Sequence, residues 1–181
     1  MANRARKLIW IFKYLREITN TQLITYIYIT LVQSILLYCI TIWGGTHKTK
    51  FISIERAQKT ILKVMLKKKR LFETNKLYLE ANVLSVRQLY ILQCILKVHK
   101  SNVIDPKSLN KRSKHTVISQ PRARNKFASM QFNIPSIKMY NKIIRKIKIY
   151  TMSHRECKNA VTSYLKTLSY RDTETLMAFS S

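Results

Sequence analysis

One long run of uncharged residues dominates the pattern of apolar and polar positions in this chain. The run, LITYIYITLVQSILLYCITIW, covers residues 23–43, and the protein's two glycines, Gly44 and Gly45, follow it directly. At about 1.5 Å per residue, a helix over this run would be about 30 Å long, enough to cross a bilayer. Because so apolar a run must be buried, it predicts either the central helix of a protein core or a membrane span. The glycine pair predicts the end of that helix, since glycine accepts the left-handed backbone that ends helices.

Polar residues inside the run favour the protein core. Gln33 and Ser34 lie at its middle, where hydrocarbon tolerates polar groups least. Lys and Arg flank both ends, so the charges give no signal for orientation in a membrane. We therefore predict a central core helix, and the alternative is a single-span membrane protein with basic flanks.

Helices are expected on both sides of this run. Residues 5–16 have the apolar spacing of a short amphipathic helix, and Asn20 or Thr21 can cap the helix that follows. A third helix is predicted over about residues 51–69, and residues 73–80 read as a short helix or turn.

The next helix begins at a recognisable boundary. Ser85 is followed three residues later by Gln88, which is the spacing of a capping box, and apolar residues then recur at helical spacing as far as His99. Since His99 has no partner nearby in the sequence, we interpret it as a structural residue at the helix edge.

The character of the chain changes after residue 100. Residues 101–135 hold all three prolines among many serines, asparagines and basic residues, which is typical of a connector. A helix is predicted to begin at Ser136, and Ser153 with Glu156 forms a capping box for a final helix. Residues 170–181 are expected to be a frayed tail.

These elements predict an all-α protein. Two glycines and three prolines in 181 residues argue against a turn-rich β fold, and a hydrophobic content of 46% excludes a disordered basic tail. We expect a helical bundle around one central apolar helix, with a basic connector and a C-terminal helix pair. The expected domains are a helical domain over residues 1–100, the connector over 101–135, and a C-terminal helical region over 136–181.

Net charge points to the partner. The chain holds 34 basic and 8 acidic residues, a formal net charge of +26, and the excess is spread over both halves. Such a chain repels itself unless a polyanion lies against it, and nucleic acid is the first candidate, ahead of an anionic membrane surface.

One predicted helix carries a row of basic residues at three- and four-residue spacing. We call it the basic row, and it consists of Arg56, Lys59, Lys63, Lys67 and Arg70. A solvated surface would explain such a row, and so would contacts with phosphates. We predict that the basic row binds nucleic acid, with Arg122 and Arg124 of the connector as secondary contacts. Its end, residues 67–70, also matches a nuclear localisation cluster, and the start of the chain lacks a secretion signal, so the nucleus or cytoplasm is expected.

The sequence offers no complete active site. Cys39, Cys94 and Cys157 lie far apart without a CxxC or CxxH pair, so we expect buried free thiols rather than a zinc site or disulfides. Eight acidic residues form no carboxylate pair suited to magnesium, and two glycines are too few for a phosphate-binding loop. No metal, cofactor or small-molecule substrate is expected.

Several segments nevertheless carry a resemblance. YITLVQSILLYCITIWGGT contains Tyr38, Trp43 and Gly44, and ISIERAQKTILKVML contains Gln58, Lys59 and Leu62, followed by SVRQLYILQCILKVHK. Together they resemble the C-terminal part of reverse transcriptases of jockey-like non-LTR retrotransposons. Farther on, FNIPSIKMYNKIIRKIK, with Tyr140 and Asn141, is similar to the closing region of that family.

The resemblance implies the thumb and the region after it, without the polymerase palm. The family's Tyr/Phe-Ala-Asp-Asp motif has no counterpart here, so its catalytic aspartates cannot be carried over and the chain is not expected to be active alone. Cys39 also stands where the family commonly has glycine, and Ile144 where it has proline.

The expected function is therefore that of a fragment of an RNA-directed DNA polymerase that grips the template–primer backbone. Two alternatives stay open, the single-span membrane protein and a structural scaffold that is inactive without the missing polymerase core.

Overall fold

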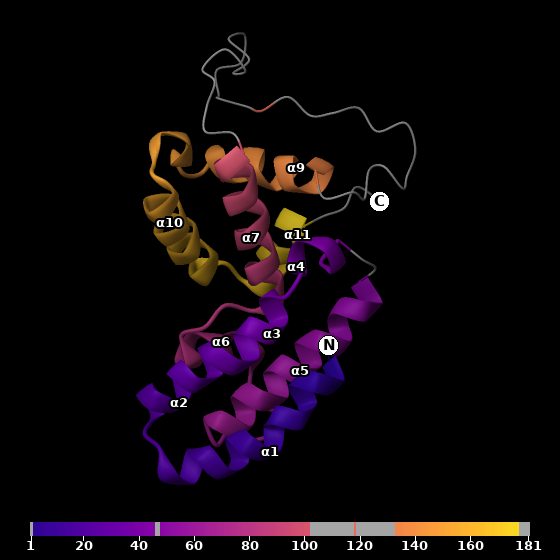
Figure 1. Cartoon of the computed structure of the whole chain (residues 1–181), viewed down its shortest axis with the longest axis vertical. Coiled ribbons are helices and arrows are strands. Elements are labelled where there is room, and N and C mark those ends of the chain that lie inside the picture. The colour runs from indigo at the N-terminus through magenta and orange to yellow at the C-terminus, as the bar shows by residue number, and fades with distance from the viewer. Residues whose placement is uncertain (1, 46–47, 102–117, 119–132, 178–181) are drawn as a thin grey trace. The chain divides into compact units, whose positions relative to one another are not determined.

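The computed structural model describes residues 2–45, 48–101, 118 and 133–177 (Figure 1). Every regular element in these residues is a helix, which confirms the predicted all-α class. The elements are α1 (Ala2–Ile18), α2 (Thr21–Tyr28), the π-helical segment η1 (Ile29–Gln33), α3 (Ser34–Leu37), α4 (Ile40–Trp43), α5 (Lys48–Met65), α6 (Thr74–Ala81), α7 (Val86–Ser101), α9 (Asn133–Ile144), the 3-10 helix η3 (Ile149–Thr151), α10 (His154–Thr167) and α11 (Tyr170–Met177).

Two compact units make up the chain. The first combines residues 1–40 with 46–86, and the second combines residues 41–45 with 87–181. The division into domains expected from the sequence stays a prediction, because nearly all of its connector lies outside the described residues.

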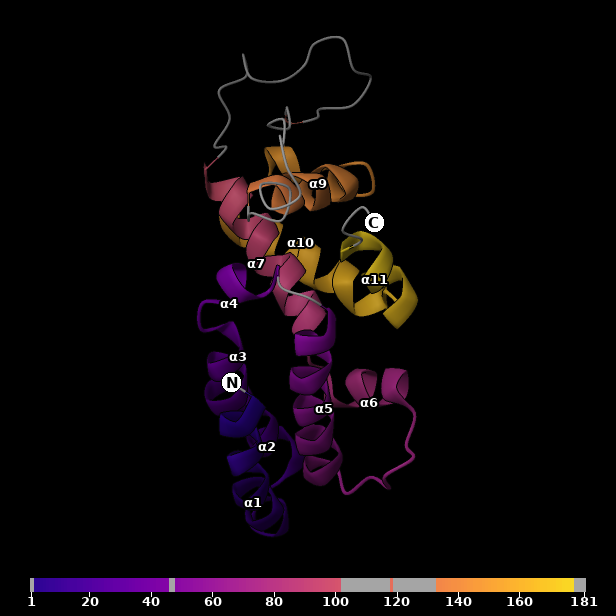
Figure 2. The same ribbon diagram turned by 90° about the vertical axis from the view of Figure 1, so that its right-hand side faces the viewer.

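In the first unit, α1 packs along α5, α2 contacts α1, and α6 contacts α5. Figure 2 shows α5 between α2 and α6. Phe12 of α1 meets Tyr28 of α2 in an edge-on ring contact with centroids 6.3 Å apart, and both rings are fully buried. Burial of two such rings excludes much apolar surface from water and fixes α1 against α2.

The apolar run does not form one continuous helix, so this expectation was wrong. It consists of α2, η1, α3 and α4, with a break at residues 38 and 39. The expectation that the whole run is buried was also wrong. The buried residues recur at every fourth position: Ile24, Tyr28, Val32, Leu36 and Ile40. The exposed ones include Leu23, Tyr26, Ile29, Leu31, Tyr38 and Ile42.

The π-helical segment accounts for the fourth-residue period. In an α-helix, four residues overshoot one full turn by about 40°, so a row at this spacing would drift steadily around the helix. A π turn contains more residues than an α turn, because its hydrogen bonds span five residues. Each residue therefore rotates less about the helix axis, and this offsets the drift of the buried row. Placed midway in the run, η1 keeps the five buried side chains on the face that the core requires.

Left-handed backbone occurs at positions other than the glycines. Among the described residues, Cys39, Lys67 and Asn82 have φ values of 51°, 53° and 51°, and no glycine has a positive φ. The glycine pair therefore does not end the run through a left-handed turn, as the sequence suggested. The break comes earlier, at Cys39.

We expect the substitution Cys39→Gly to stabilise the protein by roughly 0.5–1 kcal/mol. Left-handed backbone costs a residue with a Cβ atom roughly 1–2 kcal/mol, and the greater freedom of glycine in the unfolded chain offsets part of that gain. Cys39 is exposed, so no packing is lost. Urea denaturation of the full chain measures the change. Asn82→Gly is the matched control with a smaller gain, because asparagine tolerates this conformation, and a less stable Cys39→Gly protein would contradict the prediction.

Among the described residues, no helix combines the length and the apolar character needed to cross a bilayer.

In the second unit, α7 is fixed by polar contacts from two helices. The Gln88 side chain donates to the Leu165 carbonyl at 2.6 Å, and the Arg87 guanidinium pairs with the Glu174 carboxylate at 2.8 Å. His99 is buried between the Tyr140 hydroxyl and the Met152 carbonyl, each 3.0 Å from a ring nitrogen. It is therefore not an edge residue, and its partners come from distant parts of the sequence.

The expected frayed tail is a helix as far as Met177. In α11, Thr173 and Met177 are buried, and the Ser169 hydroxyl and Asp172 carboxylate lie 2.7 Å apart at its start. Arg87 also lies over the Tyr170 ring, 4.9 Å from its centroid. These contacts order residues 170–177, where sequence position alone had suggested fraying.

Two helix caps are as predicted. Asn20 accepts the amide of Leu23 at 2.8 Å at the start of α2. Ser153 and Glu156 form the predicted capping box of α10, and the hydrogen bond from the Ser153 amide lowers the pKa of Glu156.

The thiols differ from expectation at one position. Cys94 and Cys157 are buried as predicted, and burial raises their pKa values to about 12 and about 11, but Cys39 is exposed.

Candidate nucleic-acid interface

Only the first part of the basic row lies on one helix. Arg56 is exposed on α5, and Lys59 and Lys63 are half-buried on the same helix. Helix α5 ends at Met65, so the expectation that Lys67 and Arg70 continue its face was wrong. The chain turns instead, and the Lys63 ammonium donates to the Arg70 carbonyl. This hydrogen bond places the backbone of Arg70 next to Lys63, so Arg70 lies at the end of the basic row although it is not part of α5.

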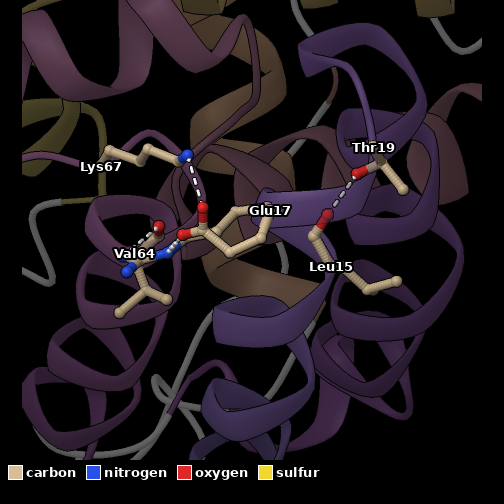
Figure 3. Close-up of polar contacts among 6 residues, drawn as sticks. Leu15, Glu17, Thr19, Val64 and Lys67 are labelled. Carbon is tan, nitrogen blue, oxygen red and sulfur yellow. Dashed lines mark hydrogen bonds and ion pairs between the residues drawn. The ribbon is translucent and has the colours of Figure 1, made fainter.

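Lys67 is held by an acidic residue from α1. Its ammonium pairs with Glu17 at 2.9 Å, and Figure 3 shows the two groups pointing at each other. The other oxygen of Glu17 accepts from Arg16, also at 2.9 Å, and Arg16 donates to the Val64 carbonyl at 3.3 Å. The hydrogen bond from Lys67 lowers the pKa of the Glu17 carboxyl. This cluster ties the end of α1 to the end of α5 and reduces the charge that Lys67 offers a ligand.

The basic residues that follow Lys67 also differ in whether they are paired within the chain or exposed. Lys68 pairs with Glu80 at 2.6 Å and lies 4.9 Å from the centroid of the Phe72 ring, whereas Lys69 and Arg70 are exposed. Part of the cluster at residues 67–70 therefore stabilises the fold, and part of it faces solvent.

The connector residues Arg122 and Arg124 lie outside the described residues, so their predicted role as secondary contacts stays a prediction.

The acidic residues show how little of the positive charge is neutralised. Glu17, Glu73, Glu80 and Glu174 pair with basic side chains of the same chain. Glu156 and Asp172 bond to serines at helix starts, and Glu55 is buried. Seven of the eight acidic residues are thus engaged or buried, and the eighth, Asp105, lies outside the described part. Because the exposed carboxylates of the described residues are already engaged, few remain to compete with an external polyanion for the other basic side chains.

Among the described residues, no group of three or more His, Cys, Asp or Glu side chains could hold a metal ion. What these surfaces offer chemically is a dense set of cationic donors, which suits the binding of phosphates.

Two features of α1 and its contact with Lys67 were not predicted from the sequence. The pairing of Lys67 with Glu17 joins residues 50 positions apart, so no local pattern could have indicated it. The exposed aromatic residues of α1 did leave a signal, because Trp10 and Tyr14 fall opposite Phe12 at helical spacing.

Comparison of the chain with known protein families, with curated proteins and with solved structures finds no match.

Proposed function

We propose that this chain is an all-α nucleic-acid-binding module that grips the sugar–phosphate backbone of a duplex without reading its sequence. The observation that carries the proposal is the net charge of +26 on a folded helical chain whose described acidic residues are engaged or buried. Arg56, Lys59 and Lys63 supply a cationic row on α5, and Arg70 extends it. Contacts from such residues to phosphates fix position and carry no base specificity.

The resemblance to jockey-like reverse transcriptases makes the proposal more specific. In it, the duplex is a template–primer, the chain is the thumb and the region after it, and the polymerase core is its partner. The left-handed backbone at Cys39 supports this reading, because the family commonly has glycine there, the residue that such backbone favours. The nucleus or cytoplasm is the proposed location.

Salt dependence tests this function. If about five phosphates are neutralised, log K should fall against log[salt] with a slope of about −4. Fluorescence anisotropy of a labelled duplex, titrated with the full chain between about 50 and 200 mM salt, measures the slope. Duplexes of unrelated sequence should bind alike. An affinity that does not change with salt would reject the proposal.

The scaffold alternative also rests on a particular observation. Leu23, Tyr26 and Ile29 are exposed on a run that holds no charged residue, and in this alternative the missing polymerase core covers them. If this reading holds, the chain should aggregate when expressed alone and should bind duplexes without the salt slope given above.

A further inference from the structure

Helix α1 has an exposed apolar face that the core does not use. Trp10, Tyr14 and Ile18 lie at four-residue spacing and are 75%, 63% and 61% exposed. Ala5 and Phe12, on the opposite side of the helix, are buried. We call the exposed residues the aromatic face. Because Trp10 and Tyr14 are one helical turn apart, their Cβ atoms lie about 6 Å from each other.

Basic residues occupy helical positions next to Trp10 and Tyr14. Arg6, Lys7 and Lys13 are exposed, and helical spacing places each of them within one turn of Trp10 or Tyr14 on the same side of α1. The only carboxylate of α1, Glu17, is already engaged by Lys67 and Arg16. The field around the aromatic face is therefore positive.

Exposed rings with basic residues beside them suit the binding of nucleic-acid bases better than the binding of a protein partner. The centres of protein interfaces are depleted in lysine, whereas Lys7 and Lys13 lie beside the rings of the aromatic face. A surface that binds single-stranded nucleic acid needs what is found here, exposed rings on which bases stack and cations along the backbone. The exposed surface of α2 is different, because no charged residue occurs in the apolar run.

We infer that Trp10 and Tyr14 form a stacking platform for two successive unpaired bases of a single-stranded nucleic acid, with Arg6, Lys7 and Lys13 along its phosphates. The inference rests on the proposed function and extends it from the duplex to a single strand. Exposure leaves both rings available, and one helical turn between them separates the two bases.

The test compares two single strands of equal charge. One is a labelled oligothymidine about twelve nucleotides long, and the other is an abasic strand of the same length. Stacking is worth roughly 1–3 kcal/mol per base, which converts to roughly 5- to 150-fold per ring. We expect the full chain to bind oligothymidine at least about tenfold more tightly than the abasic strand.

Two variants separate stacking from simple apolar contact. The double variant Trp10→Leu/Tyr14→Leu keeps an apolar surface without rings, and it should lose the preference for oligothymidine while binding the abasic strand as before. The matched double variant Trp10→Phe/Tyr14→Phe keeps the rings and should retain most of the preference. In a Trp43→Phe background, oligothymidine should also quench the fluorescence of Trp10, which reports stacking without any change to the platform.

Either of two results would overturn the inference: equal binding of both strands by the unaltered chain, or a preference that survives in the leucine variant. The second would mark the aromatic face as an apolar docking surface. The duplex salt slope, measured in parallel, separates the two proposals. A normal slope without base preference rejects only the platform, and a slope near zero rejects the nucleic-acid function as a whole.

Discussion

Replacing Gln58 by leucine should lower the free energy of unfolding by roughly 3–5 kcal/mol. Gln58 is fully buried on α5, and its amide makes four hydrogen bonds. The nitrogen donates to the Tyr28 hydroxyl at 2.8 Å and to the Leu84 carbonyl at 2.9 Å. The oxygen accepts from the Tyr78 hydroxyl and from the Val86 amide, both at 2.9 Å.

The large effect follows from what the substitution leaves behind. A glutamine amide has two donor hydrogens and two acceptor lone pairs, so Gln58 is fully satisfied. Leucine would strand the Leu84 carbonyl, the Val86 amide and the Tyr28 hydroxyl away from water, at roughly 1–3 kcal/mol each. The same four bonds link α5 to α2, to α6 and to the start of α7, so several elements of the first unit lose a common anchor.

Urea denaturation of the full chain, followed by circular dichroism, measures this loss. Gln22→Leu on the exposed surface of α2 is the control and should change stability by no more than about 0.5 kcal/mol. Tyr28→Phe removes one of the four partners and should cost about 1 kcal/mol. A Gln58→Leu protein as stable as the Gln22→Leu control would show that the amide network does not hold the first unit together.

Neutralising Arg56, Lys59 and Lys63 together by glutamine should change the salt slope of duplex binding from about −4 to about −1, because each lost phosphate contact removes about one unit. Affinity at low salt should fall alike for every duplex sequence, since phosphate contacts carry no base information. Lys67 is left unchanged, because its pairing with Glu17 also fixes α1 to α5.

A second triple variant controls for net charge. Arg145, Lys146 and Lys148 are also exposed, and their replacement by glutamine removes the same charge from a different surface. If the α5 row is the site, the control retains most of the salt slope. Equal losses in both variants would mean that binding follows total charge and that the basic row is not a distinct site.

Local contacts were predictable from the sequence, and distant ones were not. The Asn20 cap and the Ser153–Glu156 capping box lie within one helical turn, so residue type and spacing were enough. The all-α class followed from apolar periodicity and from the small number of glycines. By contrast, the four bonds of Gln58 join residues 20 to 30 positions apart, and no short pattern encodes them.

The errors have physical causes of the same kind. The tail was expected to fray because the pairing of Glu174 with Arg87 joins residues 87 positions apart and cannot be inferred from neighbouring residues. The basic row was extended through residue 70 because helical spacing continues there in the sequence. The left-handed turn at Lys67 ends that periodicity, and only the backbone reveals it.

The wide turn at η1 gives the apolar run one place where its length can change. Five buried side chains depend on a spacing of four that an unbroken α-helix would not maintain. Losing a single residue from α2 would rotate every later side chain of the run by about 100° and take Leu36 and Ile40 out of the core. Losing one from Ile29–Gln33 would instead close the wide turn to an ordinary α-helical turn, which covers about the same total angle with one residue fewer, so the later side chains would keep their positions. Related chains should therefore vary in length at this segment more readily than in the α-helical parts of the run.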